Sequence, residues 1–295
     1  EVLHDGDEAA VGRVHGVGGC AGVGVDAGVG GLAGVRSFAH VWRFTLVAET
    51  SFAGLRGAIV GVLRPEMPMH EELSLPLAAT ALLLVDFQEE HRRDTRYLAS
   101  RYEVALANGR RLLEAARAAG IAVMHAEYVR DFARVPPRPF EILGPEGEPG
   151  FSDAAGGLVA ICPEVAPGAG EPVFTKNDAS AFADTELARA LTARGIAWLI
   201  VAGAWTEACV AATVRDGIAA GFRVLLVKDA CASGTEMMHE TAVLDLANRL
   251  TGGGVAATGA ALALIAGQAA TVWRLRTMVP FRYDADTYRA LYAAL

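Results

Sequence analysis

The sequence lacks a basic surface charge, a cysteine framework and a membrane-spanning apolar run. Its 295 residues carry 34 acidic and 26 basic side chains, a formal net charge of −8, so no excess of positive charge attracts nucleic-acid phosphates or anionic lipid. Only four cysteines occur, without a CxxC pair or a nearby His at metal-ligand spacing, which argues against a zinc site and a disulfide framework. Glycine, polar or charged residues break every apolar run before the roughly 20 residues that a span needs. We therefore expect neither nucleic acid nor membrane as a partner.

The beginning of the chain also lacks a cationic signal segment, because acidic side chains are prominent there: Glu1, Asp5, Asp7 and Glu8. Together with the few cysteines, this favours a cytoplasmic location. Residues 1–66 are biased to Gly, Val and Ala, without sustained helical or strand periodicity. Two interpretations stay open for this N-terminal extension, namely sequence upstream of the natural start at Met67 or Met69, or a weakly structured tail.

From residue 80 onward, short runs rich in Val, Ile and Leu alternate with segments of helical period, a pattern typical of repeated βα units. Right-handed crossovers would place such strands parallel in one sheet with helices on both faces. The fold class predicted is a three-layer, doubly wound α/β domain with a mostly parallel six-stranded sheet. The predicted strands cover 80–85, 121–126, 172–175, 196–202, 222–228 and 254–258, and the predicted helices 95–119, 183–194, 207–220 and 237–250.

Two further segments complete the predicted organisation. Residues 127–171 are dense in Pro and Gly and have little regular pattern, and connections of that length often cover an active site. The last stretch, 269–295, is rich in aromatic residues and is expected to pack on the main domain, 67–268, or on a partner subunit.

Three side chains that can do chemistry fall at predicted strand ends. Asp86 ends the strand ALLLV, Lys176 ends PVFT, and Cys209 begins the helix after IAWLIVAG. In an open parallel sheet such positions collect at one edge. A thiol needs a lowered pKa or a base to become a nucleophile. The helix N-terminus and Lys176 would favour the thiolate, and Asp86 could take the proton and later deliver it to an amine.

Each residue also has a plain structural interpretation. Taken singly, Cys209 could be a small core residue, Asp86 a cap of a turn, and Lys176 a solvated surface residue. Their placement at the same edge of the predicted sheet favours a shared function.

The sequence resembles the isochorismatase-like cysteine hydrolase superfamily, which includes nicotinamidases, carbamoylsarcosine amidases, biuret hydrolases and ureidoacrylate hydrolases. The resemblance is carried by LLLVDFQ around Asp86, by GEPVFTKNDASAF, by GIAWLIVAGAWTEACVAATVRDGIAAGFRVLLVKDAC, and by the later HETAVLDL and GGGVAATGAAL. These motifs span roughly residues 78–266.

The resemblance implies that Asp86, Lys176 and Cys209 match the family's catalytic triad, with a thioester on Cys209. It further implies a cis peptide between Ala204 and Trp205, with the backbone N–H groups of Trp205 and Cys209 directed at the developing oxyanion. The alternative for this segment is an ordinary loop.

Departures from the family pattern narrow the substrate. Metal-dependent relatives carry an Asp-x-His and a further His, whereas this chain reads HAEYVRDF after its second strand, so we expect no metal and no organic cofactor. His125 is interpreted as a core residue. True isochorismatases commonly lack the nucleophilic cysteine, so Cys209 favours amide chemistry. The family's usual Tyr before SAF is replaced by Ala179.

The substrate pocket is expected to be small and suited to a planar group, with Arg130 or Arg134 available to a substrate carboxylate. The residues expected beside the site are Phe87, Tyr128, Arg130, Phe132, Asn177 and Phe182. The function predicted is cleavage of a small linear amide or carbamoyl compound by a homo-oligomer, a dimer or tetramer. The alternatives are a vinyl ether hydrolase on the same fold and a non-catalytic binding protein.

Overall fold

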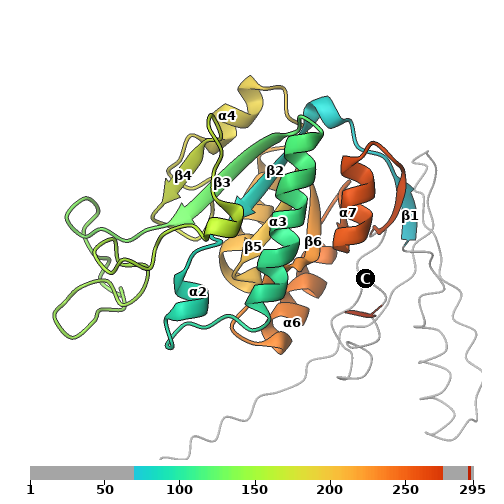
Figure 1. Cartoon of the computed structure of the whole chain (residues 1–295). Helices are drawn as coiled ribbons and strands as arrows, with labels where there is room; N and C mark the ends of the chain where they lie inside the picture. The colour runs from blue at the N-terminus through green and yellow to red at the C-terminus, as the bar shows by residue number, and fades with distance from the viewer. Residues whose placement is uncertain (1–69, 275–291, 294–295) are drawn as a thin grey trace, which may run out of the picture. The chain divides into compact units, whose positions relative to one another are not determined.

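Eight strands form one sheet in the order β1-β8-β7-β6-β5-β2-β3-β4 in the computed structural model of the chain, which describes residues 70–274 and 292–293 (Figure 1). The predicted extension 1–66 lies outside the described residues. The strands are β1 (His70–Leu73), β2 (Thr80–Val85), β3 (Ala122–Tyr128), β4 (Val173–Lys176), β5 (Trp198–Ala204), β6 (Arg223–Ala232), β7 (Gly254–Ala256) and β8 (Ala270–Trp273).

The predicted doubly wound α/β fold is confirmed, and the six predicted strands are the parallel ones, β2 to β7. The predicted number of strands was too low. β1 and β8 pair antiparallel with each other, and β8 also pairs with β7 at Val255. Both are only four residues long, too short to show a clear period. The sheet therefore continues past residue 268, where the predicted domain ended.

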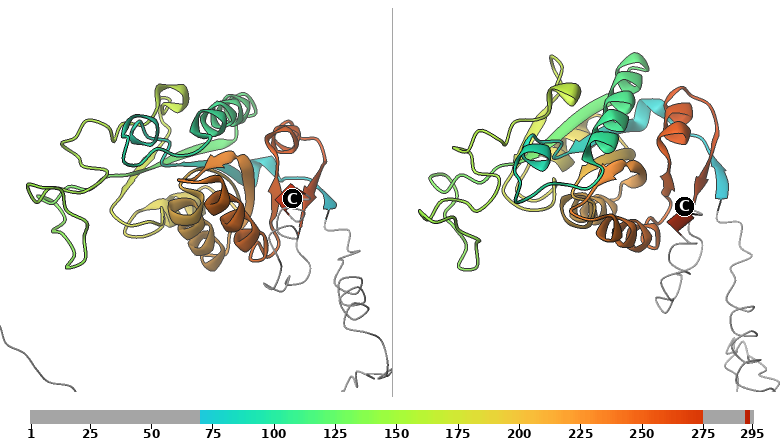
Figure 2. Two further views of the ribbon diagram at one scale, coloured as in Figure 1. Left: turned by 90° about the horizontal axis from the view of Figure 1, so that it is seen from below. Right: turned by 60° about the horizontal axis from the view of Figure 1, so that its bottom comes forward.

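Helices cover both faces of the sheet, as the two views of Figure 2 show. They are α2 (Glu90–Arg93), α3 (Tyr102–Ala118), α4 (Leu187–Ala193), α5 (Ala211–Ala219), α6 (Glu236–Ala247) and α7 (Thr258–Ile265), with short 3₁₀ turns η1 (Leu77–Ala79) and η2 (Pro163–Val165) and a π turn η3 (Thr206–Val210). None of the helices among these described residues is long and apolar enough to cross a membrane.

Two predicted helices begin later than expected, because left-handed residues precede them. Arg101 has φ of 57° immediately before α3, and Asp184 has φ of 53° upstream of α4. An L-residue in this conformation cannot continue a right-handed helix. The predicted starts at 95 and 183 were therefore wrong by several residues.

The continuous apolar run of β2 is explained by burial on both faces. Leu82 and Leu84 belong to the core cluster that includes α3 residues, whereas Leu83 and Val85 belong to the cluster that includes α4 and α5 residues. Each buried leucine stabilises the fold by about 2 kcal/mol. β2 is thus held rigidly between two cores, and the residue after it starts from a fixed position.

The sheet reverses its winding between β2 and β5, since β2 pairs with β3 on one side and with β5 on the other. Ligand sites of open α/β sheets lie outside the strand carboxyl ends at such a switch point. The long connection from β3 to β4 contains only isolated bridges and η2, and it projects beyond the sheet in Figure 1. Near the other end of the chain, the Tyr292 hydroxyl lies 3.0 Å from the His239 Nε2, so Tyr292 itself contacts the domain.

Candidate active site

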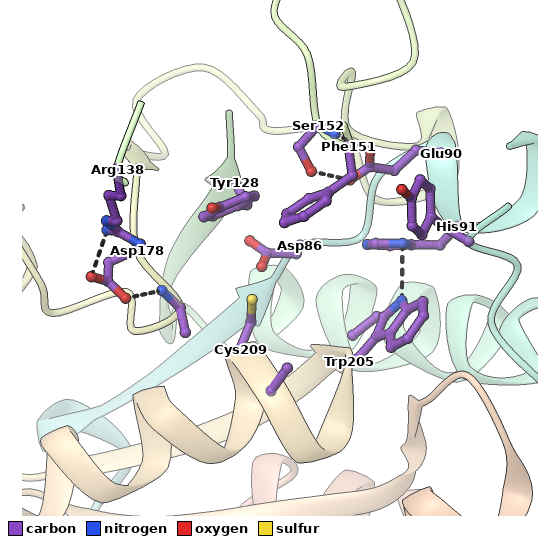
Figure 3. Close-up of a pocket in the computed structure, with 14 residues that line it drawn as sticks. Asp86, Glu90, His91, Tyr128, Arg138, Phe151, Ser152, Asp178, Trp205 and Cys209 are labelled. Atoms are coloured by element: carbon purple, nitrogen blue, oxygen red, sulfur yellow. Dashed lines mark hydrogen bonds and ion pairs between the residues drawn. The ribbon is translucent and has the colours of Figure 1, made fainter. Parts of the chain in front are cut away.

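Three side chains from separate βα units meet at this switch point. The Lys176 Nζ lies 2.8 Å from the Asp86 Oδ2 and 3.2 Å from the Cys209 Sγ. Figure 3 shows the Cys209 sulfur pointing toward the Asp86 carboxyl group. The structure thus brings together the three residues that the sequence predicted as catalytic.

Asp86 leaves β2 in a left-handed conformation, with φ of 50°. Aspartate tolerates this region better than most residues. The Asp86 N–H donates to the Ala126 carbonyl of β3 at 2.9 Å, which ties the turn to the neighbouring strand. The carboxyl group is therefore placed at the sheet edge by backbone geometry and is buried, with 1% exposure.

Lys176 is the last residue of β4, and its side chain is fully buried. Its ammonium group donates to the Asp178 carbonyl (3.2 Å) and lies over the Tyr128 ring, 4.6 Å from the ring centre. The alternative of a solvated lysine is therefore wrong. A buried ammonium is tolerated only with such partners.

Cys209 lies in the π turn η3 between β5 and α5, which differs from the plain helix start that was predicted. π turns of this kind are frequent at functional sites. The peptide bond between Ala204 and Trp205, just before η3, is cis. The Trp205 indole Nε1 donates to the His91 Nδ1 at 3.1 Å.

Gly203 permits the close approach of β5 to β2 behind the site, where it pairs with Val85. Its φ is +147°, and a Cβ there would lie 1.9 Å from the Val85 carbonyl oxygen. Only glycine fits so close to a neighbouring backbone.

Electrostatics in the site favour a neutral thiol beside an ion pair. Burial, then the Asp86 carboxylate, raises the pKa of Cys209 well above its ordinary value, and Lys176 opposes this only in part. Burial also raises the pKa of Asp86, against the effect of Lys176. Burial alone would lower the pKa of Lys176, but Asp86 and Cys209 outweigh it and hold that pKa above normal. Lys176 therefore favours the thiolate, as expected, but burial outweighs it and the net direction is toward the neutral thiol.

A cavity of about 380 Å³ opens above Cys209. Aromatic side chains form part of its walls, with Tyr128 stacked on Phe151 at 5.9 Å between ring centres. The lining residues are Asp86, Glu90, His91, Tyr97, Tyr128, Arg138, Phe151, Ser152, Asp178, Ala179, Ala204, Trp205, Ala208 and Cys209. Such a volume suits a small molecule.

Of the six residues expected to form the pocket, only Tyr128 lines the cavity. Phe87 and Phe182 face the two hydrophobic cores, where they contact Tyr102 and Phe222 respectively. Both were misplaced because aromatic residues beside a site are as often packing as lining.

Arg130, Phe132 and Asn177 also lie outside the lining residues. The Arg130 guanidinium is buried and paired with the Glu141 carboxylate at 2.8 Å. Its central carbon lies 5.3 Å from the Phe132 ring centre, and its Nη1 lies 3.4 Å from the Asn177 Oδ1. Arg130 is thus committed to the connection from β3 to β4, and it does not meet a substrate carboxylate.

Eight lining residues were not predicted: Glu90, His91, Tyr97, Arg138, Phe151, Ser152, Asp178 and Ala208. Glu90 accepts hydrogen bonds from the N–H and hydroxyl of Ser152 (3.0 and 2.7 Å). Glu90 is the first residue of α2, and the turn that separates it from Asp86 is not helical, so no periodicity marked it. Phe151 and Ser152 lie in a segment without periodicity, so no sequence signal marked them.

One group of potential metal ligands occurs among the residues that the structure describes, namely Glu89, Cys162 and Glu164. Arg92 already contacts both carboxylates, at 2.5 Å to Glu89 and 2.8 Å to Glu164. These residues lie outside the cavity lining. His125, predicted as a core residue, is buried and bonds Glu171 at 2.9 Å.

The fold and the site define a doubly wound α/β protein of the hydrolase type, with a cysteine at a strand-to-helix junction. The isochorismatase domain model matches residues 80–259. The chain belongs to the isochorismatase family. It is 33% identical over 171 residues to maleamate amidohydrolase from Pseudomonas putida, covering 56% of this chain and 78% of that protein. It is 31% identical over 185 residues to a ureidoacrylate amidohydrolase from Yersinia enterocolitica, covering 54% and 78%.

Solved structures show the same fold. A cysteine hydrolase from Pseudomonas syringae pv. phaseolicola aligns with a TM-score of 0.56 at 20% identity, covering 66% of this chain and 95% of that one. An isochorismatase-family hydrolase from Chromobacterium violaceum aligns with a TM-score of 0.55 at 26% identity, covering 66% and 98%. The similar curated proteins include amidohydrolases, which supports a hydrolase acting on carbon–nitrogen bonds.

Proposed function

We propose that this protein hydrolyses the C–N bond of a small amide or carbamoyl compound through a thioester on Cys209. The observation that carries the proposal is the contact of one buried ammonium, that of Lys176, with both the Cys209 sulfur (3.2 Å) and the Asp86 carboxylate (2.8 Å). The cleft above them has room for a small substrate.

In the first half-reaction the Cys209 thiol gives its proton to Asp86 as the sulfur bonds to the substrate carbonyl carbon. This transfer suits the raised pKa values of both groups, because a carboxylate with elevated pKa is a better base. The backbone N–H groups of Trp205 and Cys209 would stabilise the oxyanion. Asp86 then protonates the leaving nitrogen, the C–N bond breaks, and ammonia or an amine departs.

In the second half-reaction a water molecule attacks the thioester carbonyl and gives a proton to Asp86. The S–C bond breaks, the acid product leaves, and the proton returns to the Cys209 sulfur. Lys176 stays charged throughout and keeps Asp86 oriented. The chain would require no cofactor for this cycle.

The test is ammonia release from a panel of ureido acids, biuret, nicotinamide and maleamate, with isochorismate assayed beside them. The full-length protein should release ammonia from at least one amide, and Cys209→Ala and Cys209→Ser should not. Undiminished turnover by Cys209→Ala would refute the mechanism. Hydrolysis of isochorismate alone would support the vinyl ether alternative, and no turnover of any compound would support a non-catalytic role.

We also propose that residues 67–268 form most of the catalytic domain and that it works in the cytoplasm as a homo-oligomer. The packing of Tyr292 on His239 and Lys228 supports a C-terminal segment that covers the domain. Light scattering of the full chain tests the oligomeric state, and a monomeric mass would contradict it.

A further inference from the structure

His91 presents an unsatisfied polar atom at the cavity. The residue is buried, with 9% exposure, and lines the cavity above Cys209. Its Nδ1 accepts a hydrogen bond from the Trp205 indole at 3.1 Å, whereas its Nε2 is buried without a hydrogen-bond partner. The Asp86 backbone lies near the ring and favours its protonation, but it does not complete a hydrogen bond with Nε2.

The hydrogen bond to Trp205 determines where the proton of His91 lies. An indole N–H only donates, so Nδ1 must carry the lone pair and Nε2 the hydrogen. Burial, then the charge of Lys176, lowers the pKa of His91 to about 4, so the ring is neutral at physiological pH. His91 therefore offers one fixed N–H donor, and a buried donor without an acceptor is costly.

The charges around the cavity restrict what can accept this bond. Arg138 is the one guanidinium among the lining residues, and it is paired with Asp178 at 2.8 Å. The ammonium of Lys176 is paired with Asp86. Glu90 supplies a carboxyl group whose oxygens accept from Ser152. No cation that lines this cavity is unpaired, so a substrate carboxylate would have to compete with Asp178 for a counterion.

We propose that His91 determines specificity by donating its Nε2–H to an uncharged acceptor on the substrate, away from the reacting amide, and that the site selects against amides carrying a carboxylate. The inference rests on the proposed amide hydrolysis and names its substrate class. Figure 3 shows His91 at one end of the cavity, Arg138 with Asp178 at the other, and Cys209 between them. The aromatic rings of Tyr128 and Phe151 suit a flat, neutral group between these ends.

The ion pair of Arg138 also explains how selectivity could be reversed. Asp178→Asn would remove the charge that neutralises Arg138 and keep the Oδ1 that accepts from the Ala179 N–H (2.6 Å). The freed guanidinium could then receive a carboxylate. The two ends of the cavity can thus be tested separately.

Two matched substrate pairs provide the test. Maleamide and maleamate differ only in an amide in place of a carboxylate, and nicotinamide and benzamide differ only in a ring nitrogen acceptor, with isonicotinamide moving that acceptor. For the full chain, kcat/KM should be at least about 10-fold higher for maleamide than for maleamate. It should likewise be at least about 10-fold higher for either nicotinamide or isonicotinamide than for benzamide. His91→Phe should bring the pyridine to benzamide ratio near one, and Asp178→Asn should raise the maleamate to maleamide ratio at least several-fold.

A purely structural role of His91 would lower kcat for all these amides alike and leave the ratios unchanged, which would overturn the proposal. His125→Gln is the matched control, because His125 is also a buried histidine but bonds Glu171 outside the cavity. It should leave the ratios unaltered. A preference for maleamate by the unmodified chain would overturn the inference and leave amide hydrolysis intact.

A binding measurement tests the inference even when no compound is turned over. In Cys209→Ala protein with ¹⁵N-labelled histidine, the Nε2–H resonance of His91, assigned with His91→Phe, should shift on adding maleamide or a pyridine amide and not on adding benzamide or maleamate. A shift with maleamate alone, or with none of the compounds, would overturn it.

Discussion

Replacing Lys176 with methionine tests the central ion pair of the site directly. The Lys176 and Asp86 side chains are 0% and 2% exposed and 2.8 Å apart. Removing one partner of a buried pair leaves an uncompensated charge and costs about 3–5 kcal/mol. A domain of this size loses about 2–4 °C in melting temperature per kcal/mol, so Lys176→Met should melt about 6–20 °C lower.

The loss should also depend on pH. Burial already raises the pKa of Asp86 in the folded protein, and without the ammonium this pKa rises further. A carboxyl group with a raised folded pKa favours the folded state at low pH, and this contribution is lost as the pH rises through the folded pKa. The deficit of Lys176→Met relative to the unmodified chain should therefore be larger at pH 8 than at pH 5.

A second substitution separates stability from catalysis. Asp86→Asn combined with Lys176→Met removes both charges and should recover most of the lost stability, while hydrolysis stays abolished in both variants. Calorimetric or circular dichroism melts at several pH values, with ammonia release beside them, provide the measurements. The reasoning fails if Lys176→Met melts within 2 °C of the unmodified chain, or if the double variant is no more stable than the single one.

Three further predictions concern the Cys209 thiol, the close packing at Gly203 and the pKa of His91. Asp86→Asn should abolish ammonia release yet speed alkylation of Cys209 by iodoacetamide at pH 8, because the carboxylate raises the pKa of the thiol; slower alkylation would contradict this. Gly203→Ala should yield little folded protein, since its Cβ would lie 1.9 Å from the Val85 oxygen, and a normal melt would disprove the close packing. The pKa of His91 in the folded protein is lowered to about 4, so between pH 7 and 5 the unfolded chain gains a proton at this residue and the folded chain does not. The free energy of unfolding should therefore fall by about 2 kcal/mol over this range. In His91→Phe the free energy of unfolding, measured by denaturant titration at each pH, should fall less between pH 7 and 5. An equal fall in the variant and the unmodified chain would refute the lowered pKa of His91.

The positions of the three candidate catalytic residues could be predicted from sequence because strand ends determine them. β2 was predicted at its observed bounds, since a run of six buried apolar residues followed by Asp86 has few other interpretations. Lys176 ends β4 and Cys209 follows β5, and both strands were placed within two residues. Residues at the carboxyl ends of parallel strands lie at the same edge of the sheet, independent of the loop conformations. Three strand ends, each recognised from its own segment, were therefore enough to bring together residues that are far apart in sequence.

The cavity wall could not be predicted in the same way. Phe151 and Ser152 reach the site from the irregular connection between β3 and β4, where neither period nor turn chemistry sets a direction. Arg130 was expected at the substrate and is instead paired with Glu141, eleven residues further along the same connection. The partner of a charged side chain in a loop is a tertiary property, and single-residue chemistry does not reveal it.

This difference has a functional consequence. The sheet edge supplies the thiol, the carboxyl group and the ammonium, and the family relationship covers this part of the chain. The segments around the sheet edge supply the remaining polar contacts: α2 presents the donor of His91, and the connection from β3 to β4 presents Arg138, which is paired with Asp178. Under the proposed function, maleamate amidohydrolase and the ureidoacrylate amidohydrolase would share the chemistry of this site without sharing its substrate. The sheet would determine the reaction, and the pairing of the charges around the cavity would determine which substrate is accepted.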